Sequence, residues 1–137
     1  MIIKSPKKVE IRNSKGKGRG VFATESILAG EVIEVCPILV LPTNPMMDNF
    51  ILIDYRFSYP CKPKSEMMSD ELRYVIPLGY GCIYNHSDQN NAIWRQHSEY
   101  EALEFYAIRD ISKNEEICTR YTKSDGYFQS RPYLKKI

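Results

Sequence analysis

The sequence lacks closely spaced cysteines and long apolar runs, and both absences exclude whole classes of protein. Its four cysteines stand 25, 21 and 36 residues apart, so no C-x-x-C pair predicts a zinc cluster or a redox motif. The longest apolar runs, such as residues 38–41, are far shorter than a membrane span. We therefore expect no bound metal, no membrane segment, and thiols that are buried and free.

The first residues also lack the apolar run and cleavage site of a secretory signal. We therefore expect an intracellular protein, in the cytoplasm or, if the source is eukaryotic, in the nucleus. A chain of 137 residues with 43% hydrophobic residues is long enough for one domain with a core.

Charge is unevenly distributed, although the net charge is only +2. Residues 1–20 carry seven Lys or Arg and one acid, whereas the rest carries 12 basic and 16 acidic residues. A basic arm is typical of nucleic-acid binding, but residues 1–20 contain no aromatic side chain for stacking. The acidic remainder instead favours a cationic, lysine-bearing partner. Charge alone leaves both interpretations open.

Short apolar and alternating segments, separated by Gly, Pro and Asn, predict a mainly β domain with little helix. One helix of about two turns is expected at 69–76, beginning at Ser69 and ending before Pro77. Pro37 and Pro42 are expected to close strands. The expected strands cover residues 9–12, 21–23, 31–35, 38–41, 50–55, 92–95 and 103–107.

One pattern occurs twice, 84 residues apart. Phe22-Ala23, Ile27 and Gly30-Glu31-Val32-Ile33 are echoed by Tyr106-Ala107, Ile111 and Asn114-Glu115-Glu116-Ile117. Gly30 and Asn114 fall at the same place, and both residue types tolerate a left-handed backbone conformation. The echo predicts that one strand-turn-strand unit is used twice.

The stretch from Gly79 to Asn91, GYGCIYNHSDQNN, has the most distinctive chemistry. Two glycines interrupt an apolar run, and Asn85, His86 and Ser87 then supply an amide, an imidazole and a hydroxyl. The structural alternative is a tight turn, since Asn, Ser, Asp and Gly are turn formers.

Three motifs in order give this stretch a more specific meaning. Asn85-His86-Ser87 followed by Asn91 resembles the Asn-His-Ser-x-x-x-Asn motif of SET-domain protein lysine methyltransferases. Gly18-Arg19-Gly20-Val21-Phe22 resembles the early glycine loop of that family, and Glu115 to Tyr121 resembles its closing strand. The resemblance implies small curved sheets with a knot-like C-terminal segment. It also implies one domain over 1–137, with a core at about 9–121, an insert at 43–77 and a tail at 122–137.

The chemistry of this family is methyl transfer from S-adenosylmethionine to a lysine amine. A free lysine has a pKa near 10.4, so an unprotonated amine at pH 7 costs roughly 4–5 kcal/mol. An apolar channel with aromatic walls lowers the pKa of an amine and still tolerates its cation. Holding the reactants in line contributes more, roughly 7–11 kcal/mol.

The resemblance assigns roles to individual residues. Tyr121 is implied as the catalytic residue, with its hydroxyl at the methyl-transfer site. The polar-aromatic tail from 122 to 137, which contains Phe128, has two open interpretations: a frayed end or an aromatic lid that folds back. The implied cofactor-binding residues are Lys17, Gly18, Arg19, Gly20, Asn85, His86, Tyr121 and Phe128. The implied substrate channel contains Tyr80, Tyr84, Trp94 and Thr119, although Trp94 could equally be a core residue.

Departures from the family pattern keep alternatives open. Arg120 stands where many members have Asp, so it must find a carboxylate or point outward. Asp88 and Asn90 replace a common Cys and Pro, which agrees with the absence of a C-terminal cysteine cluster. We expect an active methyltransferase with a lysine-bearing protein substrate, in a form that can be a homodimer. The alternatives are an inactive binding module of the same fold and a basic nucleic-acid-binding domain.

Overall fold

The computed structural model describes residues 1–41, 55–59 and 73–121, and these residues form nine strands and no helix. The strands are β1 (Val9–Ser14), β2 (Gly18–Ala23), β3 (Val32–Val40), β4 (Phe57–Tyr59), β5 (Arg73–Pro77), β6 (Asn85–His86), β7 (Ala92–Gln96), β8 (Ala102–Ala107) and β9 (Glu116–Thr119). The expectation of a mainly β domain built from small sheets is confirmed.

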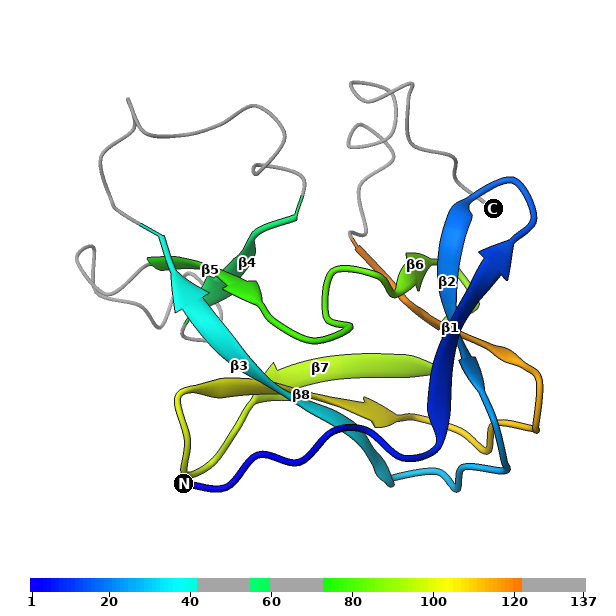
Figure 1. The fold of residues 1–137 in the computed structure, drawn as a ribbon, viewed down its shortest axis with the longest axis horizontal. Helices are drawn as coiled ribbons and strands as arrows, with labels where there is room; N and C mark the ends of the chain where they lie inside the picture. The colour runs from blue at the N-terminus through cyan, green and yellow to red at the C-terminus, as the bar shows by residue number, and fades with distance from the viewer. Residues whose placement is uncertain (42–54, 60–72, 122–137) are drawn as a thin grey trace.

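The strands form two sheets that meet around the central motif (Figure 1). One sheet has the order β4-β5-β3-β8-β7 and is antiparallel throughout. The other has the order β1-β2-β9-β6, in which β9 pairs antiparallel with β2 and parallel with β6. The C-terminal strand is therefore inserted between the N-terminal hairpin and the Asn-His-Ser motif, rather than added at an edge.

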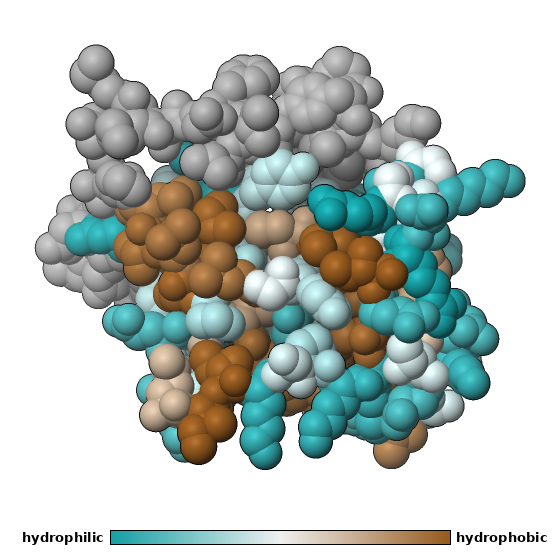
Figure 2. Space-filling model, in the orientation of Figure 1, coloured by the Kyte–Doolittle hydropathy of each residue, from teal (hydrophilic) through white to brown (hydrophobic). Residues whose placement is uncertain are grey.

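The core lies where the two sheets face each other. Its largest fully buried side chains include Tyr84, Phe105 and Leu103, and all four isoleucines of the repeated pattern are buried as well. Apolar side chains also gather on the surface over β3, β4 and β5 (Figure 2), and Leu39, Val40 and Leu78 are among the exposed ones.

The predicted repeat is confirmed, and its two copies contact each other. Gly30 and Asn114 both have positive φ, 87° and 72°. Gly30 N donates to the carbonyl of Ala107, and Asn114 N donates to that of Ala23. Ile27 and Ile111 form an isolated antiparallel bridge with a backbone hydrogen bond in each direction. The β2–β3 unit thus packs against the equivalent β8–β9 unit through reciprocal contacts, with Ile27 opposite Ile111.

Two predictions about prolines and helix are wrong. Pro37 does not end a strand: β3 runs through it, because Pro37 stands where pairing with β8 ends and pairing with β5 begins. The expected helix at 69–76 is contradicted by strand β5, which pairs with β3 and β4. Residues 50–54, most of another expected strand, lie outside the described residues.

Candidate active site

A cavity of about 370 Å³ opens beside the central motif, between the N-terminal hairpin and the β4 segment. Its described walls contain seven of the residues expected at a methyl-transfer site, together with a segment at 55–58 that sequence reasoning did not assign to it. The described lining is Lys17, Arg19, Tyr55, Arg56, Phe57, Ser58, Gly81, Cys82, Ile83, Tyr84, Asn85, Trp94, Thr119 and Tyr121.

Tyr121 is held at both its backbone and its hydroxyl. Its hydroxyl donates to the Tyr84 carbonyl at 2.7 Å, and its backbone N–H donates to His86 Nδ1 at 3.0 Å. The ring centroids of Tyr121 and His86 lie 5.3 Å apart. Tyr121 remains 41% exposed, so the hydroxyl is fixed in position while the side chain stays accessible from the cavity.

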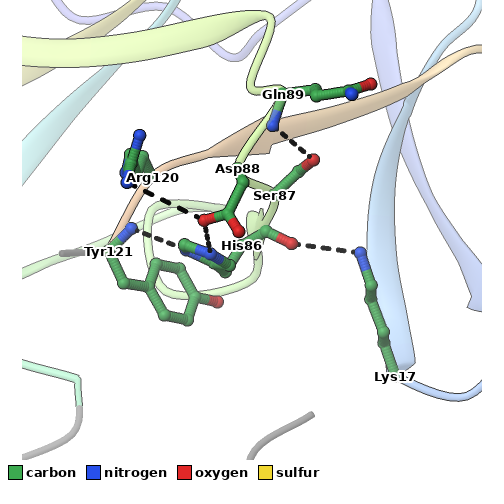
Figure 3. A network of polar contacts seen from close by, with 7 residues as sticks. All are labelled: Lys17, His86, Ser87, Asp88, Gln89, Arg120 and Tyr121. Atoms are coloured by element: carbon green, nitrogen blue, oxygen red, sulfur yellow. Dashed lines mark hydrogen bonds and ion pairs between the residues drawn. The ribbon is translucent and has the colours of Figure 1, made fainter. Parts of the chain in front are cut away.

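The His86 ring is a structural group in this arrangement. Because Nδ1 accepts a hydrogen bond from Tyr121, it carries no proton, and the proton of the neutral ring is on Nε2. Nε2 lies 3.1 Å from Asp88 Oδ1 and donates to it (Figure 3). The ring is buried, and its two nitrogens are occupied in orienting Tyr121. Only the main chain of His86 is left to contact a ligand.

Arg120 finds the carboxylate that its position requires. Its guanidinium lies 4.0 Å from Asp88 Oδ1, the same oxygen that receives the His86 hydrogen bond (Figure 3). Arg120 does not line the described cavity. Asp88, which replaces the Cys of the family motif, thus serves both the histidine and the arginine.

Asn91 fixes the closing strand to the motif. Its side-chain amide donates to the Glu116 carbonyl at 2.8 Å, and its side-chain oxygen accepts from Cys118 N at 2.9 Å. Its backbone N–H donates to the Cys118 carbonyl at 3.2 Å. Asn91 is buried, and its side chain makes the hydrogen bonds to β9 that a neighbouring strand would make. The Asn-His-Ser-x-x-x-Asn motif therefore positions the segment that ends at Tyr121.

Asn85 presents an acceptor to the cavity. Its Nδ2 donates to the Arg19 carbonyl and to Glu116 Oε2, each at 2.8 Å. Both partners can only accept, so the amide orientation is fixed and Oδ1 is left for a ligand. Gly20 packs against this pair, since a Cβ there would lie 2.4 Å from Glu116 Oε2. Ser14 holds the other oxygen of Glu116 at 2.7 Å.

Lys17 bridges the glycine loop and the motif. Its ammonium donates to the His86 carbonyl at 3.1 Å (Figure 3). The neighbouring Gly18 has a φ of 79°, a conformation that favours glycine. Lys17, Arg19 and Asn85 therefore lie together at one end of the cavity. Gly18, Gly20 and His86 stand just behind them and do not belong to the described lining.

The other end of the cavity has an aromatic wall. Trp94 lies edge-on to Phe57, with ring centroids 4.9 Å apart, and Phe57 lies edge-on to Phe105. Tyr84 stacks on Phe105 at 4.4 Å. Trp94 both lines the cavity and packs against the core, so the two expectations for it are compatible. Thr119 also lines the cavity, and its small side chain leaves room there.

Some expectations for the site fall elsewhere. Tyr80 is not part of the described lining; it packs against the core, and its backbone N–H donates to Glu34. Phe128 lies outside the described residues. Sequence reasoning missed Phe57, Glu116 and Glu34, which come to the site only through pairing between distant strands.

The described residues contain no group of three or more His, Cys, Asp and Glu side chains that could hold a metal ion. They also contain no helix of the length and apolar character that crossing a membrane requires.

Comparisons with known proteins agree with this geometry. The SET-domain family model matches residues 18–122. A histone-lysine N-methyltransferase of Schizosaccharomyces pombe, specific for lysine 37 of H3, is 31% identical over 123 residues, or 88% of this chain and 76% of that protein. A solved structure of a proposed histone methyltransferase from Plasmodium falciparum is 30% identical, with a TM-score of 0.68. That match covers 90% of this chain and 99% of the other.

The matched region contains the glycine loop, the central motif and the strand that leads to Tyr121, all of which contribute to the cavity lining. The chain therefore belongs to the SET-domain family of protein lysine methyltransferases.

Proposed function

We propose that this chain uses S-adenosylmethionine to methylate a lysine side chain of a protein, with Tyr121 at the transfer site. The observation that supports this most is the anchored Tyr121 hydroxyl, which stands at a cavity with polar groups at one end and aromatic rings at the other. When bound, the cofactor supplies the sulfonium methyl group that an unprotonated lysine amine attacks.

The polar end fits the methionine and ribose portions of such a cofactor. Asn85 Oδ1 and the Arg19 carbonyl are acceptors suited to an amino group, and the space where a Gly18 side chain would stand is open. The half-buried Glu116 carboxylate adds negative charge behind Asn85, which favours a cationic ligand. The ammonium of Lys17 and the guanidinium of Arg19 are placed to neutralise a ligand carboxylate.

The aromatic end fits the substrate lysine. The described lining includes no acidic side chain, so nothing among these residues holds the amine in its charged form. Aromatic faces such as Trp94 and Phe57 desolvate the amine and lower its pKa, while they still accept its cation on entry. The Tyr121 hydroxyl and the Tyr84 carbonyl lie together where the amine must arrive.

The inactive binding module is the second candidate, and Arg120 was its main support. The pairing of Arg120 with Asp88 removes the need for a rearranged site. A homodimer, nucleic-acid binding through residues 1–20 and an intracellular location stay predictions.

Incubation with S-adenosylmethionine labelled on its methyl group tests the proposal. The names of the relatives make histone H3 the first substrate, followed by a whole-protein lysate. We expect label on lysine with the wild-type chain and its near-absence with Tyr121→Phe. Cofactor binding by calorimetry without label on any protein would select the binding module instead.

A further inference from the structure

Glu34 stands out as a buried carboxylate that the proposed mechanism does not use. It lies on β3, is 4% exposed, and is the sole buried charged side chain among the described residues. No cation pairs with it there. Burial raises the pKa of its carboxyl, whereas hydrogen bonds from Tyr80, Tyr84 and the Cys36 thiol act in the opposite direction. Burying a carboxylate without a cation beside it costs free energy of folding, so its presence here needs a reason.

The turn from Gly79 to Tyr84 is built around this carboxylate. Oε2 accepts from the Tyr80 backbone N–H at 2.9 Å, and Oε1 accepts from the Tyr84 hydroxyl at 2.7 Å. Gly79, at φ 73°, passes so close that a Cβ there would lie 2.4 Å from Oε2. Three contacts within six residues thus tie the turn to one side chain, in a stretch that belongs to no strand.

The chemistry of the donors explains why an acid is present. A backbone N–H can only donate, and burial raises the pKa of the Tyr84 hydroxyl well above its ordinary value, so that hydroxyl stays protonated and donates too. Two donors from different directions require two acceptor oxygens on one short side chain. Glutamine would turn its amide nitrogen toward one of the two donors and leave it without an acceptor.

The anchored turn leads directly to the transfer site. Tyr84 is 2% exposed and stacks on Phe105, so its position is determined by its ring and its hydroxyl. Its own carbonyl is the group that receives the Tyr121 hydroxyl at 2.7 Å. Glu34 therefore reaches the Tyr121 hydroxyl through one residue, Tyr84, without touching the cavity itself.

We propose that Glu34 is a positioning residue for methyl transfer: by holding Tyr84 and the Tyr80 backbone, it fixes the carbonyl that orients the Tyr121 hydroxyl. This inference rests on the proposed function. It separates Glu34 from residues that bind the cofactor, since no contact connects it to Lys17, Arg19 or Asn85 among the described hydrogen bonds.

Glu34→Gln and Tyr84→Phe test this role, with Glu31→Gln as the matched control. Glu31 lies three residues earlier and pairs with Lys8 instead. In Glu34→Gln we expect kcat to fall roughly tenfold or more, the scale of small misplacements at a reacting centre. Cofactor Kd should change by less than about twofold, because the cofactor contacts are separate. Glu31→Gln should leave kcat unchanged.

Tyr84→Phe removes only the hydroxyl, so it keeps the proposal testable if Glu34→Gln does not fold. It should reproduce most of the loss in kcat, and the double variant should lose less than the product of the single effects. Multiplicative effects in the double variant, or an unchanged kcat in Tyr84→Phe, would overturn the proposal.

Hydrogen exchange supplies a readout that does not depend on activity. The Tyr80 amide should exchange faster in Glu34→Ala than in the wild type or Glu31→Gln, because alanine offers no acceptor to either donor. Unchanged protection would also overturn the proposal. A wild-type chain that methylates no lysine refutes the proposed function instead, and the exchange result still decides whether Glu34 anchors the turn.

Discussion

Among single side chains, Tyr121 has the most closely determined surroundings. Three groups of the central motif fix it: the Tyr84 carbonyl, the His86 imidazole and, through that ring, Asp88. The histidine, which on sequence grounds is the most obvious chemical group of the motif, is used to place a tyrosine. A chemically reactive residue type therefore does not by itself identify the catalytic group of this site. The hydrogen-bond geometry is needed as well.

Tyr121→Phe should lower kcat by roughly a hundredfold or more while cofactor Kd stays within about twofold. The change removes one hydroxyl that is bonded to a backbone carbonyl, and leaves the backbone N–H on His86 in place. Steady-state kinetics together with calorimetry measure both quantities. Tyr100→Phe, on a tyrosine outside the cavity, is the control. A Tyr121→Phe chain with near-full turnover would refute the assignment.

Trp94→Ala should shift the products toward higher methylation. The indole stands edge-on to Phe57 at the aromatic end of the cavity, so its removal makes room beside an amine that already carries a methyl group. Mass spectrometry of products at matched turnover measures the distribution, and Ile93→Ala, one residue earlier on β7, controls for general loss of packing. If the distribution is unchanged in a folded variant, Trp94 is a core residue only.

The sequence was informative about residues within its own motifs and silent about their partners. Tyr121, Asn85 and Asn91 were found because each belongs to a short recognisable string. Glu34 belongs to an unremarkable strand segment, and Glu116, although inside the closing-strand motif, was given no role there; their partners are 50 and 31 residues away. Periodicity describes which face of a strand a residue occupies, but it does not say which loop arrives there.

At the level of elements, β9 depends on contacts outside its own sheet ladder. It shares only two register pairs with β2 and two with β6. Asn91 adds two side-chain hydrogen bonds, to Glu116 O and Cys118 N. The motif that supplies site chemistry is therefore also the clamp that keeps the closing strand in place.

Asn91→Ala should destabilise the fold by about 2–4 kcal/mol, because it leaves a buried carbonyl and a buried N–H of β9 without partners. Urea denaturation followed by circular dichroism measures the change. Asn90→Ala, which removes a local bond to Ala92 O, should cost about 1 kcal/mol or less. Equal losses in the two variants would show that the clamp does not operate.

The errors at the level of elements have a common physical origin. Pro37 was expected to end a strand because it lacks an N–H, yet β3 exchanges one neighbour for another at that residue, so no donor is missed. The segment before Pro77 was expected to be helical, yet pairing with β3 decides its conformation. In both places the neighbouring strand overrides the local preference.

For the whole molecule, stability in acid depends in part on the Glu115 carboxylate, which accepts a hydrogen bond from Ser112 N in the turn before β9. Burial raises the pKa of Glu115, but the Ser112 N–H and Arg109 outweigh it, so the folded pKa lies below its ordinary value. The contribution of Glu115 to the free energy of unfolding is therefore present above its unfolded pKa, about 4.3. It is lost as pH falls through the lowered folded pKa.

Glu115→Gln should lower the unfolding free energy at pH 7 by roughly 0.5 kcal/mol, a small amount because Arg109 is largely exposed. The difference from the wild type should shrink as pH falls through the lowered folded pKa of Glu115. Thermal unfolding from pH 7 downward measures it, with Glu101→Gln at an exposed position as the control. A difference that stays constant as pH falls would contradict the assignment.

The contact between the two equivalent strand-turn-strand units has the form of a dimer interface enclosed within one chain. In a two-fold dimer contacts are reciprocal, and a residue on the axis meets its own counterpart, as Ile27 meets Ile111 here. Because the two units belong to one chain, they do not dissociate on dilution. Each unit still depends on the other for its stability, as subunits do. Substitutions at Ile27 and Ile111 should therefore be non-additive, by about 0.5–3 kcal/mol in a double-mutant cycle, and neither position is free to change without the other.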